Sequence, residues 1–489
     1  MFQDKINDIG FCFDNTYTGL PEALMSGVLP QPVKSPEVLL VNRSFAKSLD
    51  LNFSKVEDSL LAQIFSGNSL CKNSKTISQA YAGHQFGFFT NLGDGRAVLL
   101  GEHKTKKQKR FDIQLKGSGK TPYSRQGDGR AALGPVLREY LVSEAMFGLG
   151  IPTTRALAVV KTGEDVMREN PLPGAILTRV ASSHIRIGTF QFAAAKKDYK
   201  TLEALMKYTI KRHFAELIDS KNPALDLLKS VTKKQTNLVI NWMRVGFVHG
   251  VMNTDNVAVS GETIDYGPCA FLDSYSREAV FSSIDYAGRY SFGNQPIITH
   301  WNLLRFAETL LPLIDKNQKT AIEMVTDVFS DFDSMFKKKW FSMMFKKVGL
   351  SGVGDDDVLV KRLLAWMEKG GADYTNTFCD ISTKKDFYEK QYLQEDFVGW
   401  IKDWKIRLGE LKKEGFDSFT LMQKNNPVII PRNQMVESVL YEAVTNNNIN
   451  PFIDFVNVLK QPYDVRWLDS KYQTVPKGSG LGYKTFCGT

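Results

Sequence analysis

The feature that most constrains this chain is a short polar stretch enclosed by apolar residues. Residues 249–256 read His-Gly-Val-Met-Asn-Thr-Asp-Asn, and residues 265–267 add Asp-Tyr-Gly. Carboxylate and amide oxygens are the ligands that Mg²⁺ and other hard cations prefer. We therefore expect a turn that holds a divalent cation beside bound phosphates, with Asn256 and Asp265 as the ligands.

The spacing of this stretch resembles the catalytic loop and metal-binding turn of protein-kinase-like folds. There, His-x-Asp-x-x-x-x-Asn supplies a base and a metal ligand, and a later Asp-Phe-Gly supplies the second ligand. Asn256 and Asp265 fit the two metal positions, but the base position is Val251. Valine cannot accept a proton, so the chain is either an inactive kinase or performs other chemistry on its nucleotide. Asp255 is the carboxylate available as a general base, with a loop-capping role as the alternative. We expect His249 to brace the loop.

Upstream residues supply a candidate ion pair. Residues 110–116 alternate apolar and polar side chains as a strand does. Residues 135–149 have the apolar spacing of a helix that begins at a proline. Lys116 at the end of the strand and Glu139 on the helix match the lysine–glutamate pair of kinase-like sites. Two unrelated surface residues are the alternative.

A Gly-Asp-Gly-Arg sequence precedes this strand. It predicts a tight hairpin between strands over 84–91 and 96–102. Gly93 and Gly95 would let the backbone approach phosphate oxygens, and Arg96 would add positive charge. A simple turn without a ligand explains the same residues.

Two further features bear on phosphate binding. Arg179 and Arg186, seven positions apart, would neutralise a polyphosphate, although two surface arginines have the same spacing. The sequence Gly119-Lys120-Thr121 suggests a P-loop, but that motif requires glycine where this chain has Gln114. We therefore disfavour a P-loop.

The chain changes character along its length. Residues 1–80 combine a proline-punctuated stretch with helical periodicity over 38–65, and we expect an extension that packs on the core. Strand patterns dominate residues 81–190, and helical patterns dominate residues 191–330, which contain the catalytic loop and metal turn. Residues 331–489 read as a helical C-terminal region with a cysteine-bearing tail. The predicted fold class is α+β, a kinase-like two-lobed fold with a strand-rich N-lobe, a helical C-lobe and two terminal extensions.

Several further elements follow from the same periodicities. The predicted strands are 156–161 and 174–180, the predicted helices are 202–218, 235–245, 298–314 and 435–446, and further helices are expected between about 320 and 425. The basic run 104–110 reads as a solvated hairpin loop.

Composition excludes several classes of protein. A hydrophobic content of 43% and a charged content of 24% are ordinary for a globular protein of 489 residues. The net charge of +9 suits a polyphosphate or an acidic partner, but the basic residues are dispersed along the chain. No nucleic-acid-binding motif is visible, and five scattered cysteines indicate neither a disulfide framework nor a thiolate zinc site. Without a signal peptide or an apolar run of membrane-spanning length, we expect a cytoplasmic monomer.

Taken together, the motifs resemble the selenoprotein O family of pseudokinases. The resemblance is dense over residues 80–300 and looser elsewhere. The stretches that carry it are Tyr81 to Gly87, Leu92 to Ala97, Asp112 to Gly119, Thr121 to Arg125, Gly129 to Ala131, His249 to Asn256, Asp265 to Pro268, Arg289 to Pro296 and Arg432-Asn433.

The resemblance implies a kinase-like fold that binds ATP in a flipped orientation. It implies transfer of AMP, with release of pyrophosphate, to Ser, Thr or Tyr hydroxyls of proteins, including the enzyme itself. The inverted nucleotide would explain why the kinase base is replaced by Val251. Residues implied to bind the nucleotide are Gly93, Gly95, Arg96, Lys116, Asp128, Gly129, Arg179, Arg186 and Asp265. Glu139 would pair with Lys116, Asn256 and Asp265 would hold Mg²⁺ or Mn²⁺, and Asp255 would be the proton acceptor.

The family takes its name from a selenocysteine near the C-terminus, a position that Cys487 fills here. A redox switch between Cys269 and Cys487 is a hypothesis that unchanged activity with and without reductant would remove. Two alternatives to the adenylyltransferase stay open. One is an atypical kinase with Asp255 as its base, and the other is a nucleotide-binding scaffold without catalysis.

Overall fold

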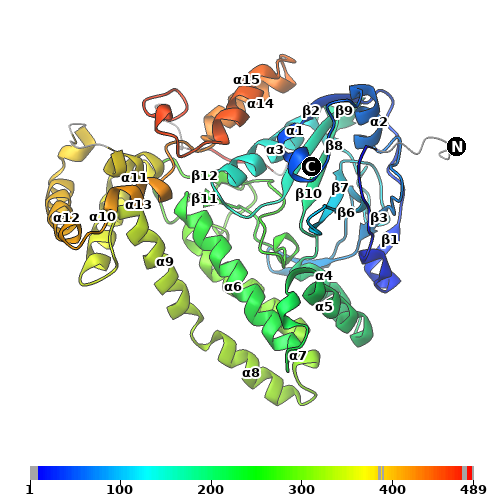
Figure 1. The fold of residues 1–489 in the computed structure, drawn as a ribbon, viewed down its shortest axis with the longest axis horizontal. Coiled ribbons are helices and arrows are strands. Elements are labelled where there is room, and N and C mark those ends of the chain that lie inside the picture. Colours follow the sequence, from blue (N-terminus) through cyan, green and yellow to red (C-terminus); the bar gives the residue numbers. More distant parts are fainter. Residues whose placement is uncertain (1–8, 384–386, 388–389, 476–481, 487–489) are drawn as a thin grey trace.

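The computed structural model describes residues 9–383, 387, 390–475 and 482–486 (Figure 1). The fold is mixed α/β, with one large antiparallel sheet and many helices. The sheet lies at one end of the molecule, and helices α10 to α13 gather at the opposite end (Figure 1). Within the described ranges, no helix is both long and apolar enough to cross a membrane.

Most strands lie before residue 182, and two short ones follow later. The strands are β1 Met25–Gly27, β2 Glu37–Val41, β3 Ile77–Gln79, β4 Ala82–Gln85, β5 Phe88–Asn91, β6 Ala97–Lys104, β7 Arg110–Lys116, β8 Ala131–Ala132, β9 Arg155–Met167, β10 Pro171–Ala181, β11 Phe247–Val248 and β12 Ala270–Phe271.

The helices dominate after residue 186. They are α1 Arg43–Ser48, α2 Asp58–Phe65, α3 Leu133–Gly148, α4 Ile187–Ala195, α5 Tyr199–His213, α6 Pro223–Arg244, α7 Gln295–Ile314, α8 Gln318–Ser330, α9 Phe332–Val348, α10 Asp356–Gly370, α11 Tyr374–Thr383, α12 Glu395–Lys413, α13 Ser418–Asn425, α14 Asn433–Val444 and α15 Asn450–Leu459.

The large sheet has the order β1-β3-β6-β7-β10-β9-β2, and β8 pairs with β10 beside this path. Strand β7 is central and carries the predicted alternation. Ile113 and Leu115 pack into an apolar cluster with N-terminal residues of 9–65. Asp112, Gln114 and Lys116 point to the opposite face, because successive side chains of a strand alternate. The central strand therefore places a row of polar side chains on the face of the sheet that is turned away from the N-terminal apolar cluster.

The N-terminal region differs in part from its predicted periodicity. Instead of continuous helical structure over 38–65, it contains β2, α1 and α2. The apolar run of β2 pairs with β9 at the sheet edge. Asn42 then starts α1, because its side chain accepts a hydrogen bond from the backbone N–H of Phe45. Pairing with a distant strand overrides the local helical period.

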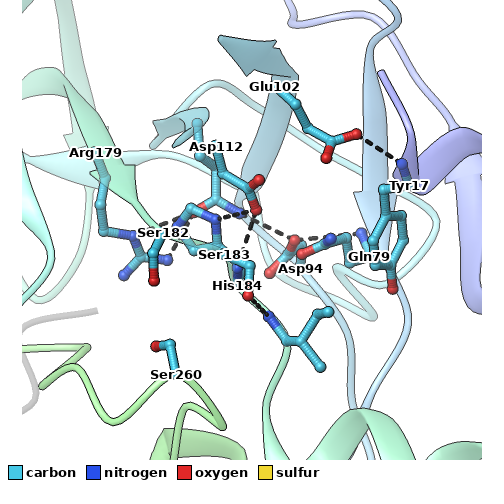
Figure 2. Close-up of polar contacts among 12 residues, drawn as sticks. Tyr17, Gln79, Asp94, Glu102, Asp112, Arg179, Ser182, Ser183, His184 and Ser260 are labelled. Atoms are coloured by element: carbon cyan, nitrogen blue, oxygen red, sulfur yellow. Dashed lines mark hydrogen bonds and ion pairs between the residues drawn. The ribbon is translucent and has the colours of Figure 1, made fainter. Parts of the chain in front are cut away.

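The predicted hairpin around Gly93 to Gly95 is wrong. Strands β4 and β5 pair with each other in a separate two-stranded sheet, through a turn at Phe86 and Gly87 with positive φ. Strand β6 pairs with β3 and β7 in the large sheet. The Gly-Asp-Gly segment connects the two sheets. It is held in place by Asp94, which is buried and accepts a hydrogen bond from the backbone N–H of Gln79 (3.2 Å; Figure 2).

The other predicted elements are confirmed, with shifted ends. The basic run 104–110 spans the β6–β7 loop, which consists of residues 105–109. Helix α3 begins at Leu133, and α5 ends at His213 with a short 3-10 turn after it. Helix α6 is longer than predicted because Asn222 caps it and Pro223 takes its first position. Helix α6 leads through β11 into the loop 249–256, and α14 packs on α3 (Figure 1).

Candidate active site

A cavity of about 860 Å³ lies where the polar face of the sheet meets α3, the loop 249–256 and α14. It collects most of the residues that the sequence indicated. Those that line it are Gly95, Arg96, Lys116, Glu139, Arg179, Arg186, Asp255, Asn256 and Asp265.

The predicted lysine–glutamate pair is present in this cavity. Lys116 Nζ lies 2.5 Å from Glu139 Oε2 and 2.9 Å from Asp265 Oδ1. Burial raises the pKa of Glu139, but the nearby Lys116 and Arg179 cations outweigh it and hold that pKa below its usual value. Glu139 is therefore a charged anchor for two cations and is not available as an acid or base.

Asp265 is the centre of the cationic cluster. Its Oδ1 lies 2.6 Å from Arg179 Nη1, and its Oδ2 lies 3.5 Å from Arg186 Nη2. Burial opposes ionisation, yet Arg179, Lys116 and Arg186 hold the pKa of Asp265 well below its usual range. The backbone of Asp265 has φ +60°, a left-handed conformation that aspartate tolerates better than most residues.

Sequence reasoning did not nominate two buried residues that hold the arginines. Gln114 Oε1 accepts hydrogen bonds from Arg179, and Gln114 Nε2 donates to Asp94 Oδ2. Asp94 Oδ1 in turn lies 3.5 Å from Arg186 Nη1. The signal was available in the alternation of residues 110–116, which places Gln114 on the same face as Lys116.

A second polar network anchors the segment between Arg179 and Arg186. Asp112 Oδ2 accepts hydrogen bonds from the backbone N–H and from Nδ1 of His184 (2.9 and 3.1 Å; Figure 2). Asp112 Oδ1 also lies 2.8 Å from Arg212 Nη2, and Arg212 pairs with the buried Glu102. Asp112, Gln114 and Lys116 of β7 thus all fix groups at or behind the cavity.

Asp255 is a buried carboxylate at the same cavity. It is 8% exposed, and its Oδ1 has no hydrogen-bond partner among the described residues. Burial raises the pKa of Asp255 to about 6. Gly83 on β4 packs directly on this side chain, since a Cβ at position 83 would lie 2.1 Å from Asp255 Oδ1. A carboxylate with this pKa is suited to accept a proton near neutral pH.

Hydrogen bonds hold the loop around Asp255 in place. His249 Nε2 contacts the Ile264 carbonyl (2.9 Å), which confirms its predicted bracing role. Burial lowers the pKa of His249, so the ring is neutral. The hairpin β4–β5 is joined to the loop by His84 N–H to Thr254 Oγ1 (2.8 Å) and by Phe86 N–H to Asn253 Oδ1 (3.0 Å).

The residues at the cavity fit a hard divalent cation. The amide nitrogen of Asn256 donates to the Val251 carbonyl (3.0 Å), so its Oδ1 is the atom left for a cation. Asp265 Oδ2 is less tightly engaged than Oδ1, and Asp255 Oδ1 is an unsatisfied acceptor. The part of the chain that the structure describes contains no cluster of three or more His, Cys, Asp or Glu that could hold a metal. The remaining ligands would come from phosphates and water, as Mg²⁺ prefers.

Three predicted nucleotide-binding residues do not line the cavity. Gly93 packs against the ring of Tyr123, where a Cβ would approach to 2.4 Å. Gly129 packs against the backbone of Gly119, since a Cβ at position 129 would be 2.1 Å from the Gly119 carbonyl oxygen. Asp128 pairs with Arg168 (2.8 Å). In this structure these residues shape the chain beside the cavity.

The sequence did not predict the C-terminal side of the cavity. Leu440, Tyr441 and Val444 of α14 line it together with Pro135 and Val136, and these residues form an apolar patch beside the ion pair of Arg138 with Glu437.

Residues 483–486 of the tail also line the cavity, and Thr485 Oγ1 donates to the Pro268 carbonyl (2.8 Å). Cys487 lies outside the described residues. Cys269 is buried as a free thiol, and burial raises its pKa to about 11. The proposed cysteine switch stays a hypothesis.

Basic side chains surround the carboxylates of Glu139 and Asp265, and the same cavity has an apolar side. A site of this type binds a polyphosphate ligand. Comparison with known proteins gives the class. Residues 9–460 match the family described as "Protein adenylyltransferase SelO", and the chain belongs to this family. The predicted family and enzyme class are therefore confirmed, and the chain is a nucleotidyltransferase.

Close relatives agree along nearly the full length. The chain is 52% identical over 482 residues to "Protein nucleotidyltransferase YdiU" of Pelagibacter ubique, covering 98% of this chain and 100% of the relative. It is 50% identical over 486 residues to the protein of that name from Nitrosococcus oceani, covering 99% of each. For the Bacillus cereus protein, the identity is 49% over 486 residues, with 99% of this chain and 100% of the relative covered.

Proposed function

We propose that this enzyme transfers AMP from ATP to Ser, Thr or Tyr hydroxyls of proteins and releases pyrophosphate. The observation that carries this proposal is the placement of Asp255. A buried carboxylate with a pKa raised to about 6 lines the same cavity as Lys116, Arg179 and Arg186. A proton acceptor beside a polyphosphate-binding cluster is what activation of a hydroxyl for attack on phosphorus requires.

The two sides of the cavity suit the two parts of ATP. The basic side chains would neutralise the phosphates, with Arg96 adding charge at the cavity wall. The apolar side formed by Pro135, Val136, Leu440 and Val444 suits a purine base. The flipped orientation, relative to a kinase, is part of this proposal.

The proposed reaction is a single displacement at the α-phosphorus. The hydroxyl oxygen of the acceptor protein attacks the α-phosphorus while its proton passes to Asp255. The bond between the α-phosphorus and the oxygen bridging to the β-phosphorus breaks, and pyrophosphate leaves. Arg179, Arg186 and Lys116 stabilise the negative charge that develops on the leaving group. Val251 is not required as a base because Asp255 takes that role.

A divalent cation, Mg²⁺ or Mn²⁺, would be held by Asn256 and Asp265. When bound it would neutralise phosphate charge and act as a Lewis acid. The chain's own contribution is to keep Asp265 ionised, because three basic side chains depress its pKa.

We also propose the two-lobed organisation that the resemblance implies. Its support is that Lys116, Glu139 and Arg179 come from 81–190, whereas Asp255 and Asp265 come from 191–330. Residues 1–80 and 331–489 would be the N- and C-terminal extensions. The cytoplasmic location, the monomeric state, self-modification and the lack of nucleic-acid or membrane partners stay predictions.

The direct test is a labelling experiment. The purified chain is incubated with a soluble protein extract, Mg²⁺, and ATP labelled on either the α- or the γ-phosphate. We expect protein-bound label from the α-phosphate alone, on extract proteins or on the enzyme, together with release of pyrophosphate. Asp265→Ala should abolish the label.

Other outcomes would identify the alternatives. Label from the γ-phosphate would contradict AMP transfer and favour an atypical kinase. Absence of label from either position, with ATP binding intact, would contradict the proposed transfer and favour a scaffold.

A further inference from the structure

The two arginines of the cavity are connected through one buried side chain. Gln114 Oε1 accepts hydrogen bonds from Arg179 Nη2 (2.7 Å) and Nε (3.2 Å). Gln114 Nε2 donates to Asp94 Oδ2 (3.0 Å), and Asp94 Oδ1 contacts Arg186 Nη1 (3.5 Å). The path Arg179–Gln114–Asp94–Arg186 runs along the floor of the cavity.

The middle of this path is shielded from water and fixed in place. Gln114 is 0% and Asp94 3% exposed. Asp94 is also held by the backbone N–H of Gln79, and Arg186 stacks on the ring of Tyr81 at 4.2 Å. Hydrogen bonds between buried groups are costly to break, because a lost partner leaves a desolvated polar atom.

A carboxamide has the chemistry that this position requires. It must accept from the guanidinium of Arg179 and donate to the carboxylate of Asp94. Glutamine does both with one planar group. An ionised glutamate can only accept, and leucine of similar size can do neither.

The path matters because Asp265 has two roles under the proposed function, as a partner of the arginines and as a ligand of the cation. Asp265 contacts both Arg179 and Arg186 directly, and under the proposed function it also ligates the cation. When the cation takes up Asp265, Arg179 keeps Glu139 as a carboxylate partner and Arg186 keeps Asp94. Gln114 is then the side chain that links the two arginines. The like charges of Arg179 and Arg186 also repel each other.

We propose that Gln114 is a positioning residue which, with Asp94, sets the direction and spacing of Arg179 and Arg186 toward the nucleotide phosphates. This inference rests on the proposed function. Gln114 does not line the cavity, and it acts through the arginines.

The test measures phosphate-dependent binding by calorimetry on the full chain. Wild type, Gln114→Leu and Gln114→Glu are titrated with ATP and with adenosine in Mg²⁺. We expect ATP affinity to fall about tenfold or more in Gln114→Leu, which is about 1.4 kcal/mol. Adenosine affinity should be unchanged because it has no phosphate. Gln114→Glu should lose less than Gln114→Leu, because it retains the contact with Arg179.

A matched control is Thr178→Val. Thr178 is fully buried on β10 beside Arg179, and its Oγ1 has no hydrogen-bond partner among the residues that the structure describes. The control should bind ATP as wild type does.

Three outcomes would overturn the inference. Wild-type ATP affinity in both Gln114 variants, or equal losses for ATP and adenosine, would assign Gln114 a merely structural role. If Gln114→Leu does not fold, Gln114→Glu decides by the same criterion. If the wild type itself bound ATP no better than adenosine, the proposed function would fail together with the inference.

Discussion

Among the single residues, Asp255 lines the cavity although its side chain is almost completely buried. Its raised pKa of about 6 means that ionisation is unfavourable in the folded protein, compared with 3.8 for an ordinary aspartate. At neutral pH the carboxylate is nevertheless ionised and therefore destabilises the fold. Under the proposed function, the role of Asp255 as the proton acceptor accounts for a carboxylate at a position where it lowers stability.

Replacement of Asp255 by Asn should separate these two effects. We expect AMP transfer to be lost, because the amide cannot accept the proton. The free energy of unfolding at pH 7 should rise by about 1–3 kcal/mol, since a pKa difference of one unit corresponds to about 1.4 kcal/mol. The gain should shrink as pH falls from 7 toward 4, because the carboxyl of the folded chain becomes protonated below pH 6, and it vanishes only below the ordinary pKa of 3.8. Urea unfolding at both pH values measures this, and a lower stability of the variant at pH 7 would contradict it.

The pH dependence of transfer follows from the same group. A general base must be deprotonated, so the rate should fall about tenfold per pH unit below pH 6. Single-turnover transfer of α-label between pH 4.5 and 8 measures the profile. A rate that stays constant down to pH 5 would argue against Asp255 as the base.

Among the secondary-structure elements, the hairpin β4–β5 packs against the loop 249–256. Its hydrogen bonds to Thr254 and Asn253 fix its position, and Gly83 leaves the space that Asp255 occupies.

A methyl group at Gly83 should therefore displace Asp255. We expect Gly83→Ala to lower the transfer rate at saturating ATP by tenfold or more, with a stability loss of about 1–3 kcal/mol from overpacking. ATP affinity should change little, because the phosphate cluster is not touched. The matched control is Gly27→Ala in β1, where a Cβ meets nothing within 4 Å. Equal effects of the two substitutions would contradict a specific role for Gly83.

In the molecule as a whole, Arg432 connects the C-terminal region to the segment that follows Asp265. Its Nη1 lies 2.9 Å from Asp273 Oδ1 and 2.6 Å from Asp373 Oδ2. The next residue, Asn433, receives a hydrogen bond from Phe271 N–H and donates one to the Phe271 carbonyl. These contacts hold α14 at its place on the cavity.

Removal of this arginine takes a cation away from the buried Asp273 and the partly buried Asp373. We expect Arg432→Ala to destabilise the fold by about 3–5 kcal/mol. Arg466→Ala, which removes an exposed pair with Asp464, should change stability by less than about 1 kcal/mol. Thermal unfolding of both variants tests this, and similar melting temperatures would contradict it.

The local parts of this site are predictable from the sequence. The alternation of residues 110–116 places Lys116 on the polar face of a strand, and the compact motif at 249–267 assigns Asp255, Asn256 and Asp265. Both follow from spacing along the chain, because a strand's period and a turn's residues are local properties. The ion pair of Lys116 with Glu139 was predicted from their order and is present at 2.5 Å.

Which distant segments come into contact is not predictable from local patterns and is known only from the tertiary structure. The strands that flank Asp94 do not pair with each other, because β5 pairs with β4 and β6 pairs with β3 and β7. The expected hairpin is therefore absent, and Asp94 instead supports Arg186. The roles of Gln114 and Gly83 and the apolar side formed by α14 each depend on three-dimensional packing between segments far apart in the chain. The physical reason is that strand pairing and burial are settled by the total free energy of packing, which no local pattern contains.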